Sequence, residues 1–132
     1  MSKQTLKLHS TTFTIHTLEV TAVIPPELFN QSMFVVAKTK DELSIVCPSE
    51  FAIDSLDAEH DWRALEVIGP LGFSLTGIMA NISGVLAKAN ISIFAISTYD
   101  TDYVLVKQQR INDAMKALKK DGYQLLNDTK LA

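Results

Sequence analysis

The chain has 132 residues, of which 47% are hydrophobic and 20% are charged, and its formal net charge is −3. These values are typical of a globular protein of one ordinary domain or two very small ones. The acidic balance argues against a nucleic-acid-binding surface, which is usually basic. No apolar run reaches the roughly 18 residues of a membrane span, and the single cysteine, Cys47, excludes an intrachain disulfide. The N-terminus has no signal-peptide core, so we expect a cytoplasmic protein.

The first half of the chain predicts short strands around one short helix. Residues 13–23 are rich in β-branched and apolar side chains, which favours a strand. Two prolines open residues 25–29, and because proline is tolerated in the first helical turn, a short helix is expected there. Residues 33–37 and 43–47 are predicted strands on either side of a charged turn. The polar and acidic residues 48–61 are the predicted linker.

The clearest element of the second half is an amphipathic helix that follows a predicted strand at residues 62–68. From Leu75 onward, apolar residues recur at offsets of 3, 4, 7, 10, 11 and 14, which is the pattern of a helix with one apolar face. Ser74 is well placed to cap the N-terminus of this helix, and Asn90 is well placed to end it.

A hairpin and a second helix follow. Residues 91–97 and 103–107 are predicted strands, because they are rich in β-branched and aromatic side chains, and they flank a turn at residues 99–102. Apolar residues at offsets of 3 and 4 and 7 from Ile111 predict a helix, and Gly122 can close it in a left-handed conformation. A short strand is expected at residues 123–126.

Residues 62–132 therefore predict the order β-α-β-β-α-β, which is the split β-α-β pattern of ferredoxin-like folds. This α+β fold has an antiparallel sheet with two helices on one face. We interpret residues 1–61 as an incomplete copy of the same unit, because a second helix is not evident there. Units of this size hold little core alone, so we expect the two to share an interface and a sheet edge.

The stretch GPLGFSLTG, residues 69–77, is the first candidate site. Gly77 is expected inside the first helical turn, where glycine costs about 1 kcal/mol relative to alanine. One explanation is a carboxylate-sized ligand on the free N–H groups of Thr76, Gly77 and Ile78. The other is close packing of the helix on a strand. The stretch lacks the full dinucleotide-binding spacing, and no phosphate-loop lysine follows it.

The turn from Ser97 to Lys107 is the second candidate. Thr98 offers a hydroxyl group, Tyr99 an aromatic wall, and Asp102 a carboxylate that would need a partner because it directly precedes an apolar strand. Asp100 is interpreted as an ordinary solvated residue. We expect this turn to lie at the opposite end of the sheet from the glycine-rich corner, so that the two would meet only across an interface.

Ser44, at the start of a predicted strand, is the third candidate, although a plain edge strand is the favoured explanation when this stretch is considered by itself. Cys47 is interpreted as a small buried hydrophobe, and His16 as a sheet residue. The three histidines have no metal-ligand spacing, and no acid–base pair supports catalysis. We therefore expect no enzyme, no metal and no cofactor.

The stretch GPLGFSLTGIMANISGVLAKANISIFAISTYDTDYVLVK, residues 69–107, together with TKDELSIVC, residues 39–47, resembles the tandem ACT-domain family. This family includes the CASTOR-type arginine sensors and the regulatory domains of aspartokinases. Its β-α-β-β-α-β modules bind small ligands, usually amino acids, between modules. The resemblance implies an ACT-like unit at residues 1–61, an ACT unit at 62–132, and a non-catalytic regulatory function.

The resemblance also implies a ligand site. The matching positions are Ser44 and Ile45 on one wall, Gly72, Thr76, Gly77 and Ile78 on the floor, and Thr98, Tyr99 and Asp102 on the other side. Asp102 would pair with a cationic group of the ligand. Leu75 stands where the arginine sensors have an acidic residue, which allows a less basic or neutral amino acid. Because the chain is shorter than those sensors, a homodimer would supply their four modules.

Two other interpretations stay open. The incomplete first half and Leu75 favour a protein–protein adaptor whose ACT pair has lost its ligand. RNA-recognition domains share the β-α-β-β-α-β order, but the strands lack their aromatic motif and the net charge has the wrong sign for RNA.

Overall fold

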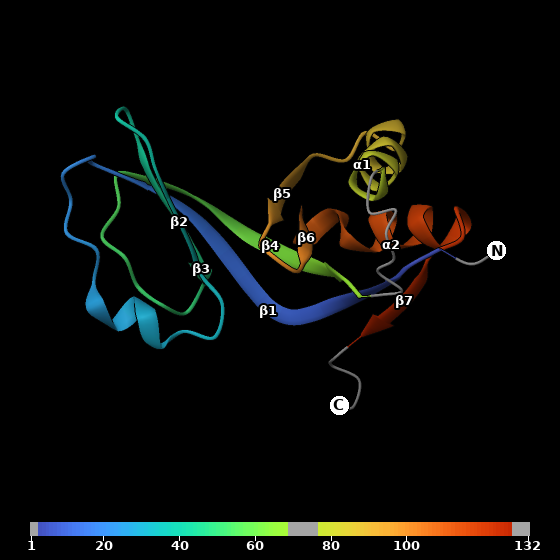
Figure 1. Ribbon diagram of the computed structural model, residues 1–132, viewed down its shortest axis with the longest axis horizontal. Helices are drawn as coiled ribbons and strands as arrows, with labels where there is room; N and C mark the ends of the chain where they lie inside the picture. Colours follow the sequence, from blue (N-terminus) through green and yellow to red (C-terminus); the bar gives the residue numbers. More distant parts are fainter. Residues whose placement is uncertain (1–2, 69–76, 128–132) are drawn as a thin grey trace. The chain divides into compact units, whose positions relative to one another are not determined.

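The computed structural model describes residues 3–68 and 77–127 of the chain (Figure 1). The chain divides into two compact units: unit 1 comprises Met1–Ser10 and Arg63–Ala132, and unit 2 comprises Thr11–Trp62. The main boundary falls next to the predicted one. The first ten residues, however, belong with the second half of the chain. Strands β1 (Thr5–Leu18) and β4 (Asp57–Val67) each contribute to both units.

Unit 1 has the predicted order of elements. After β4 come α1 (Ile78–Lys88), β5 (Ile93–Ser97), β6 (Asp102–Lys107), the short 3-10 helix η2 (Gln108–Arg110), α2 (Ile111–Lys120) and β7 (Gln124–Asn127). Strands β5 and β6 form an antiparallel hairpin, with Ile93 opposite Val106 and Ser97 opposite Asp102. The mixed α+β, ferredoxin-like architecture expected from the periodicity is therefore confirmed.

The last strand has an unexpected neighbour. In the simple β-α-β-β-α-β arrangement, β7 would pair with β4. Instead, β1 lies next to β4, and β7 pairs with β1 in parallel, from Thr5 opposite Gln124 to Leu8 opposite Asn127. The backbone N–H of Ile68 also donates to the carbonyl of Thr5 at 2.7 Å. The N-terminal strand is thus an integral part of the unit 1 sheet.

The core of unit 1 lies between the strands and the two helices, which lie side by side in Figure 1. On α1, the buried residues Ile78, Ile82 and Leu86 recur every four positions and form one apolar stripe. Burial of each such side chain stabilises the fold by about 1.5–3 kcal/mol. The strands contribute alternating residues to the same core: Leu6, Leu8, Leu65, Val67, Val104 and Val106.

Both helices end in the same way, as the predicted roles of Asn90 and Gly122 require. Asn90 follows α1 with φ 59°, and Gly122 follows α2 with φ 105°. After each left-handed residue, the next backbone N–H returns to the third-last helical carbonyl, from Ile91 to Leu86 and from Tyr123 to Leu118. This is the Schellman arrangement, and both Ile91 and Tyr123 are buried.

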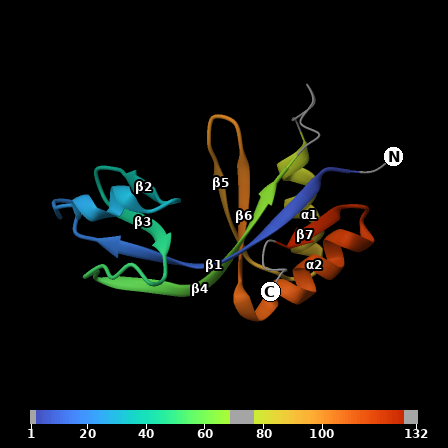
Figure 2. The same cartoon turned by 90° about the horizontal axis from the view of Figure 1, so that it is seen from below.

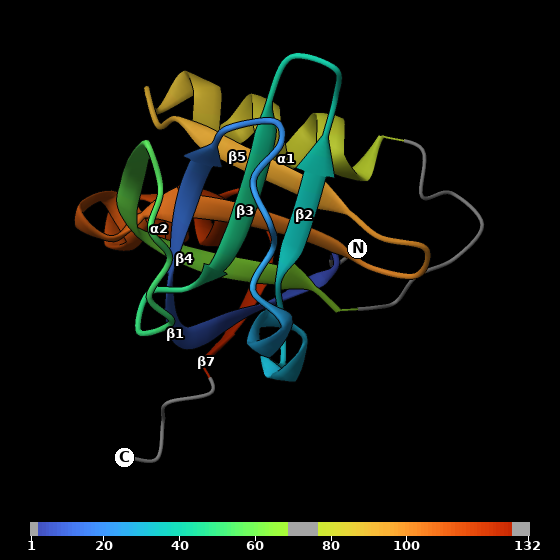
Figure 3. The ribbon, with the colours of Figure 1, turned by 90° about the vertical axis from the view of Figure 1, so that its left-hand side faces the viewer.

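Unit 2 is smaller, and among its residues, all of which the structure describes, the only helical segment is the 3-10 helix η1 (Pro26–Asn30). Strands β2 (Val35–Lys38) and β3 (Leu43–Pro48) form a hairpin, and β3 pairs with β1 (Figure 3). The predicted strand at residues 13–23 ends earlier, at Leu18. The predicted linker is partly wrong, because β4 already begins at Asp57.

The core of unit 2 lies under η1. It consists of the buried residues Leu18, Leu28, Leu43, Ile45 and Cys47, with further apolar side chains packed around them. Burial raises the pKa of the Cys47 thiol, which agrees with its interpretation as a small hydrophobe. None of the helices within residues 3–68 and 77–127 is long and apolar enough to cross a membrane.

Candidate functional site

Gly77 occupies a different position from the one expected. It is the N-cap of α1 rather than a residue of the first turn, and its φ of 94° is a conformation that favours glycine. This backbone requirement explains the glycine without a ligand. The carbonyl of Gly77 accepts the first helical hydrogen bond, from the N–H of Asn81 at 2.8 Å. Gly72, Ser74, Leu75 and Thr76 lie outside the described residues.

Ile78 is buried, with 7% of its surface exposed, and its side chain belongs to the unit 1 core. Only its backbone N–H can therefore serve a ligand. Among the described residues, none caps the start of α1 with its side chain. The first N–H groups of a helix carry a partial positive charge, so this end of α1 has the character expected of a carboxylate-binding corner.

The β5–β6 turn is tightly organised. The N–H of Thr98 donates to the carbonyl of Thr101 at 2.7 Å, and the N–H of Thr101 donates to the Thr98 hydroxyl at 3.1 Å. Asp102 accepts a 2.6 Å hydrogen bond from the hydroxyl of Ser97. The carboxylate therefore has a partner within its own hairpin. Tyr99 is fully exposed, so its ring does not form part of an enclosed site within the described residues of this chain.

The turn and the glycine corner lie at the same end of the unit 1 sheet, and our expectation of opposite ends was wrong. Figures 2 and 3 both show the β5–β6 turn near the point where β4 ends and α1 begins. The physical reason is the crossover through α1, which makes β5 run in the same direction as β4. The carboxyl ends of both strands therefore reach one edge of the sheet.

Ser44 and Ile45 lie in unit 2. Ile45 is fully buried in the core of that unit, opposite His16 on β1. Ser44 is half-buried and lines a small hollow of about 140 Å³, together with Thr17, Asp57 and neighbouring residues of β1 and β4. Of the predicted pair, only Ser44 can offer a side chain to a ligand.

The hairpins of the two units have the same turn. In unit 2, the N–H of Thr39 donates to the carbonyl of Glu42 at 2.9 Å, and the Thr39 hydroxyl accepts from the N–H groups of Asp41 and Glu42 at 3.1 Å each. Thr98 fills the corresponding position in unit 1. This likeness agrees with the interpretation of the first half as an incomplete copy of the second.

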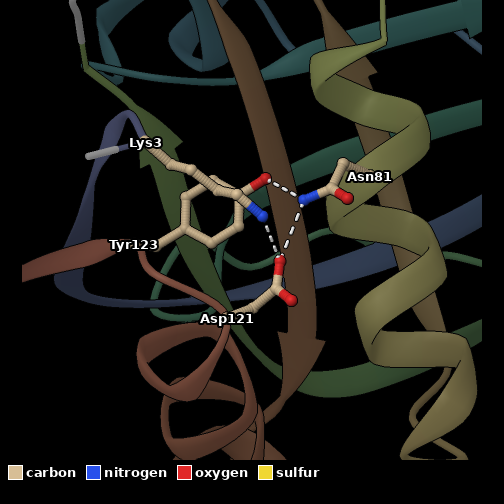
Figure 4. Close-up of polar contacts among 4 residues, drawn as sticks. All are labelled: Lys3, Asn81, Asp121 and Tyr123. Atoms are coloured by element: carbon tan, nitrogen blue, oxygen red, sulfur yellow. Dashed lines mark hydrogen bonds and ion pairs between the residues drawn. The ribbon is translucent and has the colours of Figure 1, made fainter. Parts of the chain in front are cut away.

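A polar cluster at the C-terminal end of α2 was not predicted (Figure 4). Asp121 pairs with Lys3 at 2.5 Å and accepts a 3.2 Å hydrogen bond from the amide nitrogen of Asn81. The same nitrogen donates to the Tyr123 hydroxyl at 2.6 Å. The hydrogen bond between Lys3 and Asp121 lowers the pKa of the Asp121 carboxyl group. The same bond raises the pKa of the Lys3 ammonium group. Lys3 and Asn81 are far from Asp121 and Tyr123 in the chain, so no sequence motif marked the cluster.

His16 is a sheet residue, as predicted. It is 6% exposed, its Nδ1 lies 2.9 Å from the Ser55 hydroxyl, and its Nε2 has no hydrogen-bond partner among the described residues. Burial lowers the pKa of His16, with a smaller contribution from His60. Within residues 3–68 and 77–127, no group of three or more histidine, cysteine, aspartate or glutamate side chains is arranged to hold a metal ion.

The order of elements in unit 1 is the one expected from the resemblance to ACT domains, and the comparisons agree. The ACT domain family matches residues 57–120. The human cytosolic arginine sensor for mTORC1 subunit 1 is 34% identical over 104 residues, which cover 72% of this chain and 31% of the sensor. The Bos taurus protein of the same name is 39% identical over 74 residues, or 55% and 22% of the two chains. The chain thus spans less than a third of the length of these relatives.

Solved structures give the same result. A protein of Agrobacterium tumefaciens has a TM-score of 0.87 and 28% identity, with 96% of this chain and 95% of that chain covered. The aspartate kinase of Clostridium acetobutylicum has a TM-score of 0.67, and the match covers 89% of this chain and 34% of the kinase. Its 15% identity shows a shared fold only. The predicted resemblance to the arginine sensors and aspartokinase ACT domains is confirmed.

Proposed function

We propose that this chain is a non-catalytic regulatory protein that binds a small ligand, an amino acid, at an interface between ACT-type modules. The observation that carries the proposal is the position of the β5–β6 turn beside the start of α1 (Figure 2). The first N–H groups of a helix suit a carboxylate. The carboxylate of Asp102 suits an ammonium group. One end of unit 1 therefore offers both halves of an amino-acid site.

The other proposed contacts extend this site. Gly77 and Ile78 contribute backbone groups, Thr98 a hydroxyl and Tyr99 an aromatic wall. Ser44 and Ile45, the proposed members in unit 2, and Gly72 and Thr76, which lie outside the described residues, complete the proposed set. Because Tyr99 is fully exposed, we propose that a second module, supplied by a homodimer, covers it when the ligand is bound. The name of the human relative, a cytosolic sensor, supports a cytoplasmic location.

Thermal unfolding with each of the twenty amino acids in turn tests this function. A ligand present at 100 times its dissociation constant adds about 2.7 kcal/mol to the free energy of unfolding and raises the midpoint. We expect one or two amino acids to give such a shift. No shift with any of them at millimolar concentration would refute the proposal.

The second candidate is an adaptor that binds a regulated enzyme without any ligand. The observation that favours it is unit 2, whose residues form only one short 3-10 helix and so depart from the full module. A partner that co-purifies with equal affinity in the presence and absence of amino acids would support the adaptor. A partner whose binding changes with one amino acid would support the sensor.

A further inference from the structure

An open groove lies between α1 and α2 of unit 1, with a volume of about 660 Å³. Small residues line it on both helices, including Ala80 and Gly84 of α1 and Ala117 of α2. Lys88 and Lys120 line it as well. Asp121 also lines it, but this carboxylate is already paired with Lys3.

Gly84 has no role inside the described chain that requires glycine. It lies in the interior of α1, and a Cβ atom built on it would meet no described atom within 4 Å apart from its chain neighbours and the backbone of its own helix. Glycine in a helix interior costs about 1 kcal/mol relative to alanine. The exposed positions of α1 near it are Ala80, Asn81 and Ala87, so this face carries no charge before Lys88. A surface helix normally has a charged outer face. The uncharged outer face of α1 is instead typical of a helix that packs against another surface.

Unit 2 carries a segment with the complementary chemistry. Leu56 is 65% exposed, and the exposed carboxylates of Asp54, Asp57 and Glu59 surround it in the sequence. A backbone hydrogen bond fixes this segment to β1, because the N–H of Leu56 donates to the carbonyl of Thr17 at 2.9 Å. An apolar side chain presented on a fixed backbone loses little entropy on binding.

The formal charges of the two units have opposite signs. Unit 2 has nine acidic and two basic side chains, a charge of −7, whereas unit 1 has ten basic and six acidic side chains, a charge of +4. Such complementarity steers association between copies and fixes its orientation.

We propose that the groove between α1 and α2 binds the Leu56 segment of a second copy of this chain. Leu56 would enter the groove above Gly84, and the acidic residues beside it would face Lys88 and Lys120. The two contacting surfaces differ, so the association is head-to-tail, and each copy keeps one free groove and one free Leu56 segment. This contact is separate from the proposed amino-acid site and does not depend on it.

Complementation between two variants tests the proposal. Gly84→Glu fills the groove with a negative side chain, and Leu56→Ser removes the apolar side chain. Both positions are exposed, so both variants should fold. Loss of a buried leucine corresponds to about tenfold or more in affinity. We expect each variant alone to associate at least about tenfold more weakly than wild type in sedimentation velocity at low salt.

An equimolar mixture of the two variants should form a complex of greater mass than either variant alone, because each supplies the surface that the other lacks. High salt should dissociate this complex. The matched controls are Ala87→Glu, on α1 but outside the groove lining, and Val23→Ser, another exposed apolar residue of unit 2. Both controls should associate like wild type.

Three results would overturn the proposal. The first is that Gly84→Glu and Leu56→Ser each leave the sedimenting mass the same as that of wild type. The second is that the mixture of the two variants forms no new complex. The third is that the groove binds only an acidic surface of another protein. The amino-acid thermal shift is measured on the same variants. Its presence or absence reports on the proposed sensor function alone, since neither residue belongs to that site.

Discussion

The hydroxyl of Ser97 donates a 2.6 Å hydrogen bond to the carboxylate of Asp102, across the pair of residues that closes the β5–β6 hairpin. The side chain proposed to bind a ligand ammonium group is therefore already oriented by its own hairpin. An oriented carboxylate binds a cation without first losing side-chain freedom.

Asp102→Asn should weaken ligand binding while leaving the hairpin intact, because the amide oxygen can still accept from Ser97. Removing one partner of a desolvated charge pair costs about 2–5 kcal/mol of affinity. Titration calorimetry with the amino acid found in the thermal screen measures the loss. Asp100→Asn, the same change at an exposed position of the same turn, is the control. Equal affinity in the Asp102 variant and wild type would exclude the role given to Asp102.

The stability of the fold should fall below about pH 6.5 because of His16. Burial lowers the pKa of His16 in the folded state, so the unfolded chain takes up a proton first as the pH falls. The stabilisation is complete above the unfolded-state pKa and is lost progressively as the pH falls toward the folded-state pKa.

Urea unfolding between about pH 7.5 and about pH 5 measures this loss in wild type and in His16→Gln. The variant should be less stable at the upper pH but should lose less stability on acidification. Because the other titrating groups are common to both proteins, parallel pH dependences would show that His16 does not titrate in this way.

The same substitution should have opposite effects at two glycines. Gly84→Ala should raise the free energy of unfolding by about 0.5–1 kcal/mol, because the position is helical and the space around it is open. Gly122→Ala should lower it by about 1–2 kcal/mol, because Gly122 ends α2 at φ 105°. Chemical denaturation of dilute protein measures both. Destabilisation by Gly84→Ala would mean that α1 differs locally from the arrangement described.

Tyr123→Phe should remove the 2.6 Å hydrogen bond that Asn81 donates to the tyrosine hydroxyl, while the buried ring stays in the core. Loss of one such bond lowers the free energy of unfolding by about 0.5–1.5 kcal/mol. Tyr99→Phe removes an exposed hydroxyl, and it should change stability by less than about 0.5 kcal/mol. If both variants behaved alike, the link between α1 and the end of α2 would carry no stability.

Much of unit 1 could be predicted because its signals are local. The apolar stripe of α1, the β-branched strands around the β5–β6 turn, and the left-handed residues Asn90 and Gly122 each depend on neighbours within a few positions. Unit 2 was harder. The start of β4 lies in a polar and acidic sequence that resembles a linker. The strand nevertheless begins at Asp57, because backbone pairing with β1 outweighs the low strand propensity of acidic residues.

The sequence suggested members for the candidate site but not their arrangement. The sequence singled out Gly77 and Asp102, yet it placed Gly77 in a helical turn and put the two at opposite ends of the sheet. Gly77 is a cap because its backbone conformation is left-handed, which residue identity suggests but does not prove.

By itself, the sequence determined the class of fold, the order of elements and the resemblance to ACT-domain proteins, because these follow from periodicity and from motifs read along one stretch of chain. Only the tertiary structure decided that residues 5–8 pair with β7 in the unit 1 sheet, that Lys3 meets Asp121, and that a groove opens beside Gly84. These features join residues that are distant in sequence. Their contacts form only when the chain packs, and no local pattern encodes them.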